Sequence, residues 1–230
     1  MVKDSPMANR LMEVYHRLYA AYGPQHWWPG DSPFEVITGA ILTQSAAWTN
    51  VETALANMRA AGCWSFETVH QLPEPDLAQL VRSSGYFNAK ARKLKAFAAH
   101  VAVNYQGDLA RFLSKPAAPL REELLSIHGI GDETADDIMV YAAEKPSFVI
   151  DTYTRRIMDR MEMTPDVPRP KYGDYQAVFH GSLPPDTQLF NEFHALWDRH
   201  AKESCAKTPR CEGCCLSDIC PTGQSLLVDS

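Results

Sequence analysis

The cysteines near the end of the chain are the residues whose type and spacing most plainly suggest chemistry. Of the six cysteines, five lie between positions 205 and 220. Four of these follow the spacing C-x5-C-x2-C-x5-C, at Cys205, Cys211, Cys214 and Cys220. In a reducing compartment, thiols crowded in this way favour a metal centre over disulfide bonds.

Two kinds of metal centre are compatible with these four thiolates. A structural zinc ion is usually held by two close cysteine pairs with a longer loop between them, but this set of four contains a single C-x2-C pair. A [4Fe–4S] cluster can be held by four cysteine thiolates around one compact loop. The spacing therefore favours an iron–sulfur cluster, with zinc as the alternative.

The segment HGIGDETADD, residues 128–137, is a second candidate for binding chemistry. Gly129 and Gly131 permit a tight turn between two short helices and a close approach of another molecule to the backbone. The amides of such a turn, and of the helix that follows it, suit a phosphate oxygen. An ordinary connection between helices is the alternative, although Ile130 at the tip and Thr134 after it make the motif more specific.

The elements that must position these residues are expected to be helices. Residues 7–23, for example, carry Leu11, Val14 and Leu18 at helical spacing and end at a glycine. No clear alternating strand pattern or hairpin signal is present in the sequence. The 230 residues are enough for one large domain or two small ones. We therefore expect an all-α fold.

The composition excludes several classes of protein. Hydrophobic residues make up 45% of the chain and charged residues 22%, which is typical of a soluble globular protein. No stretch is apolar over the length that a membrane span needs, and the first ten residues lack the apolar core of a signal peptide. We therefore expect a cytoplasmic protein. The net charge of −6 argues mildly against nucleic acid, but a basic face can coexist with an acidic remainder.

The glycine loop resembles the helix-hairpin-helix motif of the endonuclease III superfamily of DNA glycosylases. The resemblance runs from about Trp27 to Cys220. FVIDTYTRR is similar to the segment that carries the family's catalytic aspartate, here Asp151, and GAILTQSAAW is similar to the helix whose glutamine, here Gln44, enters the DNA. The cysteines resemble the family's [4Fe–4S] loop, with five residues in the first gap where six are usual. The family spacing leaves Cys215 outside the ligand set.

Within this superfamily, the chain resembles the 3-methyladenine DNA glycosylase III branch. Trp27 and Trp28 stand in a W-W-P motif, and Trp48 follows Gln44 by four positions. The sequence HAK, which ends at Lys202, is similar to the branch's H-G-K. The alkylation enzyme of that branch has phenylalanine in place of Trp48 and lacks the cysteine cluster, which leaves the substrate open.

The resemblance implies an enzyme that flips a damaged base out of double-stranded DNA and hydrolyses its glycosidic bond. Asp151 would stabilise positive charge on the sugar or activate water, and it can cap a helix at the same time. Gln44 would fill the gap left by the flipped nucleotide, with a capping or buried-amide role as the alternative. The hairpin residues that would contact DNA are Gly129, Ile130, Gly131 and Thr134.

The base pocket is expected to be aromatic. Tryptophans are usually core residues, but an indole face also attracts a cation by about 0.5–2 kcal/mol. An alkylated purine such as 3-methyladenine is cationic, so it is the expected substrate. The residues expected at this pocket are Trp27, Trp28, Trp48, Glu133 and Lys202, with a surface position as the alternative for Lys202.

Strand cleavage is not expected. Relatives that also cut DNA place a lysine two residues past the second glycine, where this sequence has Glu133, and glutamate cannot form a Schiff base. A monofunctional glycosylase that leaves an abasic site is therefore expected. One alternative is a mismatch or oxidised-base glycosylase, including a bifunctional one that uses Lys202 or another amine as the nucleophile. The other is a catalytically idle damaged-DNA-binding module, against which Asp151 argues.

Two helical lobes are expected, with the active site in the cleft between them. Residues 32–143 would form a six-helix lobe that contains the hairpin at about 120–141. Residues 1–31 and 144–230 would form the second lobe, with the cluster loop at 205–220. We expect a monomer in the cytosol or nucleoid of a bacterium or archaeon. Its contact with DNA would use a local basic surface made of Lys90, Lys93, Arg155, Arg156, Lys207 and Arg210.

Overall fold

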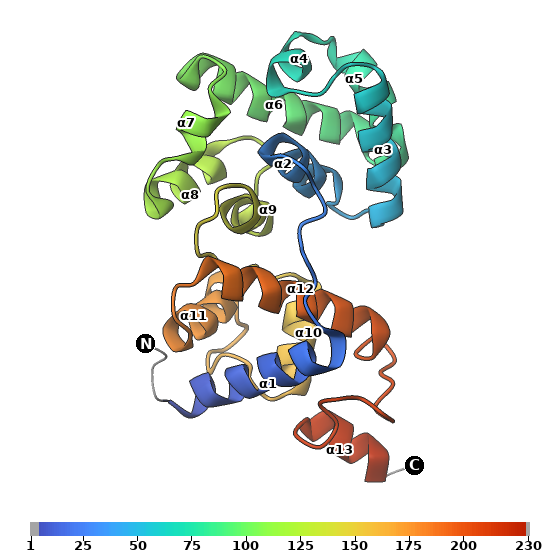
Figure 1. Cartoon of the computed structure of the whole chain (residues 1–230), viewed down its shortest axis with the longest axis vertical. Helices are drawn as coiled ribbons and strands as arrows, with labels where there is room; N and C mark the ends of the chain where they lie inside the picture. Colours follow the sequence, from blue (N-terminus) through green and yellow to red (C-terminus); the bar gives the residue numbers. More distant parts are fainter. Residues whose placement is uncertain (1–4, 229–230) are drawn as a thin grey trace. The chain divides into compact units, whose positions relative to one another are not determined.

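This computed structural model describes residues 5–228, and all the regular secondary structure in them is helical. Helices α1 to α13 follow one another along the chain, and no β-strand occurs in the described part (Figure 1). The all-α prediction is therefore confirmed. Residues 1–4 and 229–230, which the predicted second lobe includes, lie outside the described residues.

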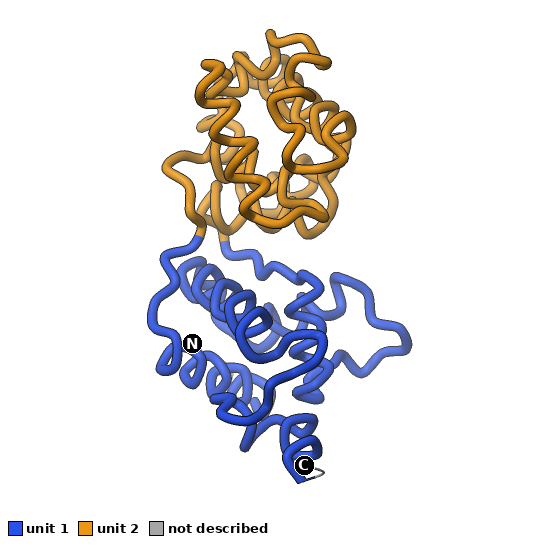
Figure 2. The backbone as a smooth tube through the Cα atoms, turned by 90° about the vertical axis from the view of Figure 1, so that its right-hand side faces the viewer, with its two compact units in different colours: residues 1–27, 146–230 blue, residues 28–145 orange. Residues whose placement is uncertain are grey.

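The chain folds into two compact units (Figure 2). Unit 1 comprises residues 1–27 and 146–230, and unit 2 comprises residues 28–145. The sequence placed these divisions at 32 and 143. The first division separates Trp27 from Trp28, so the two adjacent tryptophans belong to different units.

Unit 2 contains eight α-helices rather than the expected six. Proline begins α5 directly after α4, and Gly107 and Pro116 flank the short α7. The helices pack around α6, whose Leu94, Phe97 and Val101 are fully buried. The elements are α2 (Pro33–Leu42), α3 (Trp48–Ala60), α4 (Phe66–Gln71), α5 (Glu74–Leu80), the 3-10 turn η1 (Arg82–Ser84), α6 (Phe87–Tyr105), α7 (Leu109–Leu113), α8 (Ala117–Ser126), α9 (Asp132–Asp137) and the π-helical turn η2 (Ile138–Ala142).

Unit 1 is built from both ends of the chain. Helix α12 packs against α1 and α10, so the N-terminal helix belongs to the same core as the C-terminal half. Aromatic rings fill that core, where Phe148 stacks on Phe179 with ring centroids 3.6 Å apart and Trp197 is fully buried. The elements are α1 (Pro6–Tyr22), α10 (Thr152–Arg160), α11 (Tyr172–Ser182), α12 (Thr187–Glu203) and α13 (Pro221–Val228).

The helical hairpin of unit 2 is α8, the turn at 127–131, and α9. Arg121 on α8 reaches both acids of α9 that face it, donating from Nε to Asp136 at 2.8 Å and from Nη2 to Asp132 at 2.9 Å. The Asp136 side chain is fully buried, so its charge depends on this partner. Asp132, which follows the glycine turn, is therefore engaged by an arginine.

The two glycines of the turn have different structural roles. Gly129 adopts φ +87°, and a Cβ atom at this position would lie 2.2 Å from Cγ of Lys93. Gly131 has φ −97°, and a Cβ atom there would meet no other atom within 4 Å. The fold itself therefore requires glycine at 129, whereas the space around position 131 is open.

This difference can be tested with two matched substitutions. Gly129→Ala is expected to lower the free energy of unfolding by at least about 1–2 kcal/mol, because an alanine in the left-handed region is strained and the stem of Lys93 must move. Gly131→Ala should change it by less than about 0.5 kcal/mol. Urea denaturation of both variants measures the difference, and equal destabilisation would contradict it.

Candidate functional site

Asp151 lies at the first turn of α10, at the end of a buried extended segment. Its Oδ1 accepts the backbone N–H of Thr154 at 2.6 Å, so it caps the helix as the sequence suggested. The residues before it, Phe148 to Ile150, are buried, and the Asp151 side chain is 18% exposed. The carboxylate is therefore held in one orientation and still reaches the surface of unit 1.

His194 on α12 is a titratable neighbour of Asp151, with its Nε2 lying 3.9 Å from Oδ2 of the carboxylate. Burial lowers the pKa of His194, although the carboxylates of Asp151 and Asp198 act in the opposite direction. The imidazole is therefore neutral at pH 7. Sequence reasoning missed His194, because a histidine on the apolar face of a long helix is indistinguishable from a core residue.

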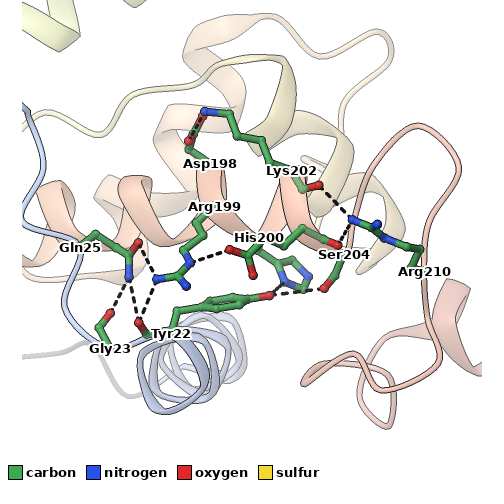
Figure 3. A network of polar contacts seen from close by, with 10 residues as sticks. Tyr22, Gly23, Gln25, Asp198, Arg199, His200, Lys202, Ser204 and Arg210 are labelled. Atoms are coloured by element: carbon green, nitrogen blue, oxygen red, sulfur yellow. Dashed lines mark hydrogen bonds and ion pairs between the residues drawn. The ribbon is translucent and has the colours of Figure 1, made fainter. Parts of the chain in front are cut away.

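Lys202 and Trp27 lie close together in unit 1. Lys202 donates to the carboxylate of Asp198 at 2.6 Å (Figure 3). The Nζ of Lys202 lies 5.8 Å from the centroid of the Trp27 ring. The charge of Asp198 raises the pKa of His194, and the charge of Lys202 lowers it. The predicted residues Asp151, Lys202 and Trp27 are thus joined through two residues that sequence reasoning did not identify, His194 and Asp198.

The other two predicted tryptophans come together in unit 2. Trp28 meets Trp48 edge to face, with ring centroids 5.5 Å apart, and Tyr141 at 5.2 Å. Gly39 makes room for them, because a Cβ atom there would lie 3.3–3.4 Å from both indoles. The Trp48 N–H donates to Glu52 at 3.0 Å. Tyr141 is a third ring of this aromatic group that the sequence analysis did not include.

The side chain of Gln44 is partly buried and is held by hydrogen bonds within unit 2, and its role as a wedge in DNA stays a prediction. Its Nε2 donates to Thr134 Oγ1 at 2.8 Å and to the carbonyl of Gly129 at 3.2 Å, and Lys93 donates to its Oε1. The side chains of Thr134 and Ile130 are buried. Ile130, which was expected at the tip of the turn, therefore packs in the core of unit 2. Glu133 is exposed on α9.

The four predicted cysteine ligands line one pocket in unit 1. Cys205, Cys211, Cys214 and Cys220 share it with His200 and Arg160, whereas Cys215 is not among its lining residues. Arg160 donates to the Cys205 sulfur at 3.1 Å. Burial and neighbouring thiols raise the pKa of Cys211 and Cys220, so these thiols would act as metal ligands only if a cationic centre displaced their protons.

Among residues 5–228, no three His, Cys, Asp or Glu side chains are arranged as the ligands of one metal ion. The observation that bears on a metal centre here is that all four predicted cysteines line the same pocket.

The predicted basic surface is wrong at Lys90. This lysine is 1% exposed, and its ammonium donates to the carbonyls of Leu42 at 2.7 Å and Ser84 at 2.5 Å. Burial, with help from Lys93, lowers the pKa of Lys90 to about 8. The lysine stabilises the end of α2 because it caps carbonyls that would otherwise be buried without a donor.

Two of the predicted basic residues brace the cysteine loop. Arg156 donates to the carbonyl of Cys205 at 2.8 Å, and Arg210 donates to the carbonyl of Lys202 at 3.3 Å. Lys207 is exposed.

Among the described residues, no helix qualifies by length and hydropathy as a membrane span.

The sequence matches a known family over more than half of its length. Residues 38–177 match the HhH-GPD superfamily of base excision DNA repair proteins. A Methanocaldococcus jannaschii protein that is named as a DNA repair glycosylase is 36% identical over 212 residues, covering 91% of this chain and 95% of that protein. Endonuclease III of Sulfolobus acidocaldarius is 26% identical over 189 residues, covering 81% of each.

Solved structures share the fold. A trapped covalent intermediate of endonuclease III with DNA superposes with a TM-score of 0.81 at 19% identity, over 96% of this chain and 98% of that one. The 3-methyladenine DNA glycosylase MagIII of H. pylori, bound to 1,N6-ethenoadenine, superposes with a TM-score of 0.70 at 24% identity, over 86% and 97%. With the family match and the relatives above, the chain belongs to the HhH-GPD superfamily, as an endonuclease III-like helix-hairpin-helix DNA glycosylase.

Proposed function

We propose that this protein is a monofunctional DNA glycosylase that removes a damaged base, an alkylated purine such as 3-methyladenine, and leaves an abasic site. The observation that carries the proposal is the setting of Asp151. Its carboxylate is oriented by the Thr154 amide, is partly exposed, and lies beside a neutral histidine. A catalytically idle DNA-binding module has no need of a carboxylate in this setting.

Cleavage of the glycosidic bond is favoured by a fixed negative charge near the sugar. Cleavage of the glycosidic bond leaves the sugar positively charged, and a preorganised carboxylate stabilises that charge without having to reorganise. One oxygen of Asp151 is engaged by the helix amide, and the other faces His194. Because His194 is neutral, it does not offset the carboxylate charge. Asp151 would thus stabilise the sugar cation or direct water to it.

The aromatic residues support an alkylated purine as the substrate. The rings of Trp28, Trp48 and Tyr141 form one group in unit 2, and flat electron-rich faces stack on a flipped base and attract a cationic one. Trp27 differs from them, because the Lys202 ammonium already lies over its ring. We therefore assign recognition of the base chiefly to the unit 2 rings.

The residues present argue against strand cleavage. Glu133 stands in the hairpin where the resemblance predicts a lysine for strand-cutting relatives. Lys202, the other amine considered, is engaged by the carboxylate of Asp198, whereas a Schiff-base nucleophile must be a neutral amine. The open space at Gly131 is available for a DNA phosphate, which such a turn can hold through backbone amides.

We further propose that the four-cysteine pocket holds a [4Fe–4S] cluster. Its ligands would be Cys205, Cys211, Cys214 and Cys220, which line the same pocket. When bound, the cluster would supply cationic iron that keeps the thiols ionised. Arg156 and Arg160 hold the carbonyl of Cys205, so the start of this loop is braced by α10.

Asp151→Asn is expected to reduce base release from a 3-methyladenine duplex by at least about 100-fold, the scale on which a preorganised electrostatic group acts. Asparagine is an equally good helix cap, so the fold should be kept. Single-turnover release is measured over duplexes with 3-methyladenine, 7-methylguanine, hypoxanthine, uracil or an oxidised pyrimidine. The exposed Asp166→Asn is the control. Activity that survives Asp151→Asn, or borohydride trapping of the wild type on DNA, would sink the proposal.

The acid side of the pH–rate profile should depend on His194. Its lowered pKa keeps it neutral until the pH falls below the ordinary value near 6.5. A cation 3.9 Å from Asp151 then offsets the carboxylate charge and slows base release. His194→Gln, which does not titrate, should retain activity at neutral pH and lose this part of the decline. Profiles of equal shape for the two proteins would exclude the effect.

The cysteine assignment can be tested with adjacent residues. Wild-type protein purified without oxygen should contain about four iron atoms and four sulfides per chain. Cys214→Ser should lose most of this iron, whereas Cys215→Ser should keep it, because Cys215 does not line the pocket. Chemical analysis of iron, sulfide and zinc gives the answer. Zinc in place of iron, or equal iron loss in both variants, would contradict the assignment.

A further inference from the structure

Lys93 of α6 lies against the glycine turn of the hairpin. Its aliphatic stem occupies the space that a side chain at Gly129 would need, since a Cβ atom there would be 2.2 Å from Cγ and 2.6 Å from Cδ of the lysine. Its ammonium donates to Oε1 of Gln44. The lysine is therefore placed beside the turn by packing at its stem and by a hydrogen bond at its tip.

The charge of Lys93 is not offset by a carboxylate. No Asp or Glu oxygen of the described residues lies within ion-pair distance of its ammonium. Two other basic groups of unit 2 are engaged, Arg121 by Asp132 and Asp136 and Lys90 by two carbonyls. Lys93 thus brings an uncompensated positive charge to the turn.

Gln44 is a neutral partner that holds this lysine. Its Nε2 is fixed to Thr134 at 2.8 Å and to the Gly129 carbonyl at 3.2 Å, which presents Oε1 to the ammonium. A hydrogen bond to an amide oxygen is weaker than one to an ionised phosphate oxygen. A phosphate at the turn can therefore replace the Gln44 oxygen as the partner of the Lys93 ammonium. A carboxylate in the place of Gln44 would instead compete with the phosphate for that ammonium.

We propose that Lys93 is a phosphate-binding residue of the hairpin, and that Gln44 holds it beside Gly129 until a DNA phosphate takes over its ammonium. The inference rests on the proposed function, in which the hairpin grips the DNA backbone. It assigns Gln44 a positioning role before DNA binds. The phosphate and the Gln44 amide oxygen compete for the same ammonium of Lys93. Binding of the phosphate therefore releases the Gln44 oxygen.

Salt dependence separates this role from a purely structural one. Loss of one phosphate contact reduces the slope of log affinity against log salt by about 0.9, so the affinity ratio between 50 and 200 mM salt should narrow by about 3.5-fold. We expect this change in Lys93→Met, which keeps a long apolar stem against Gly129. Lys93→Arg and Gln44→Met, which keep the cation, should retain the wild-type slope.

The measurement is binding to an undamaged duplex by fluorescence anisotropy, with circular dichroism melting to show that each variant folds. Arg111→Met, which removes an exposed cation from α7, controls for the loss of one charge. Two results would overturn the role of Lys93 and leave the proposed function standing, provided that wild-type binding varies with salt. Either Lys93→Met keeps the wild-type slope of log affinity against log salt, or its slope changes no more than that of Arg111→Met. If wild-type binding is absent or insensitive to salt, the proposed function itself fails.

Discussion

A buried carboxylate determines how the hairpin of unit 2 is built. The Asp136 side chain has no exposure to water, so the fold must supply a cation, and Arg121 of α8 does so with two short hydrogen bonds. This ion pair sets α8 against α9 and draws Asp132 to the same arginine. The turn between the helices then needs glycine at 129, where the stem of Lys93 leaves no room for a side chain. The arrangement of Gln44, Lys93 and Thr134 depends on that turn.

A second constraint acts in unit 1, where one carboxylate has a structural role and is the proposed chemical group. Asp151 caps α10 through one oxygen and faces the buried His194 with the other. Burial lowers the pKa of that histidine and keeps it neutral, so it does not offset the negative charge that the proposed reaction requires of Asp151. Lys202, by contrast, is neutralised by Asp198 and covers Trp27. The same helix, α12, therefore presents Asp151 with an uncharged neighbour and places the cation farther along.

The predictions that rest on local sequence patterns agree with the structure, whereas two that depend on the surroundings of a side chain do not. The helical fold and the hairpin follow from apolar periodicity and glycine placement, and both are present in the structure. Lys90 was expected on a basic surface because it lies among other basic residues, but α6 turns it toward the carbonyls of Leu42 and Ser84. Ile130 was expected at the tip of the turn, among the residues that contact DNA, but it packs in the core. In both cases, the orientation of a side chain about its helix or turn decided its environment.

The sequence by itself determined the all-α class, the superfamily, the four cysteines that share a pocket, and the candidate carboxylate at position 151. These depend on residue type and on short spacings, which can be read from the sequence before the fold is known. Only the tertiary structure decided which residues meet across long separations, such as His194 with Asp151, Lys93 with Gly129, and Trp28 with Tyr141. The physical reason is that burial and the charge of spatial neighbours set the state of a side chain, and these neighbours come from helices far apart in the chain.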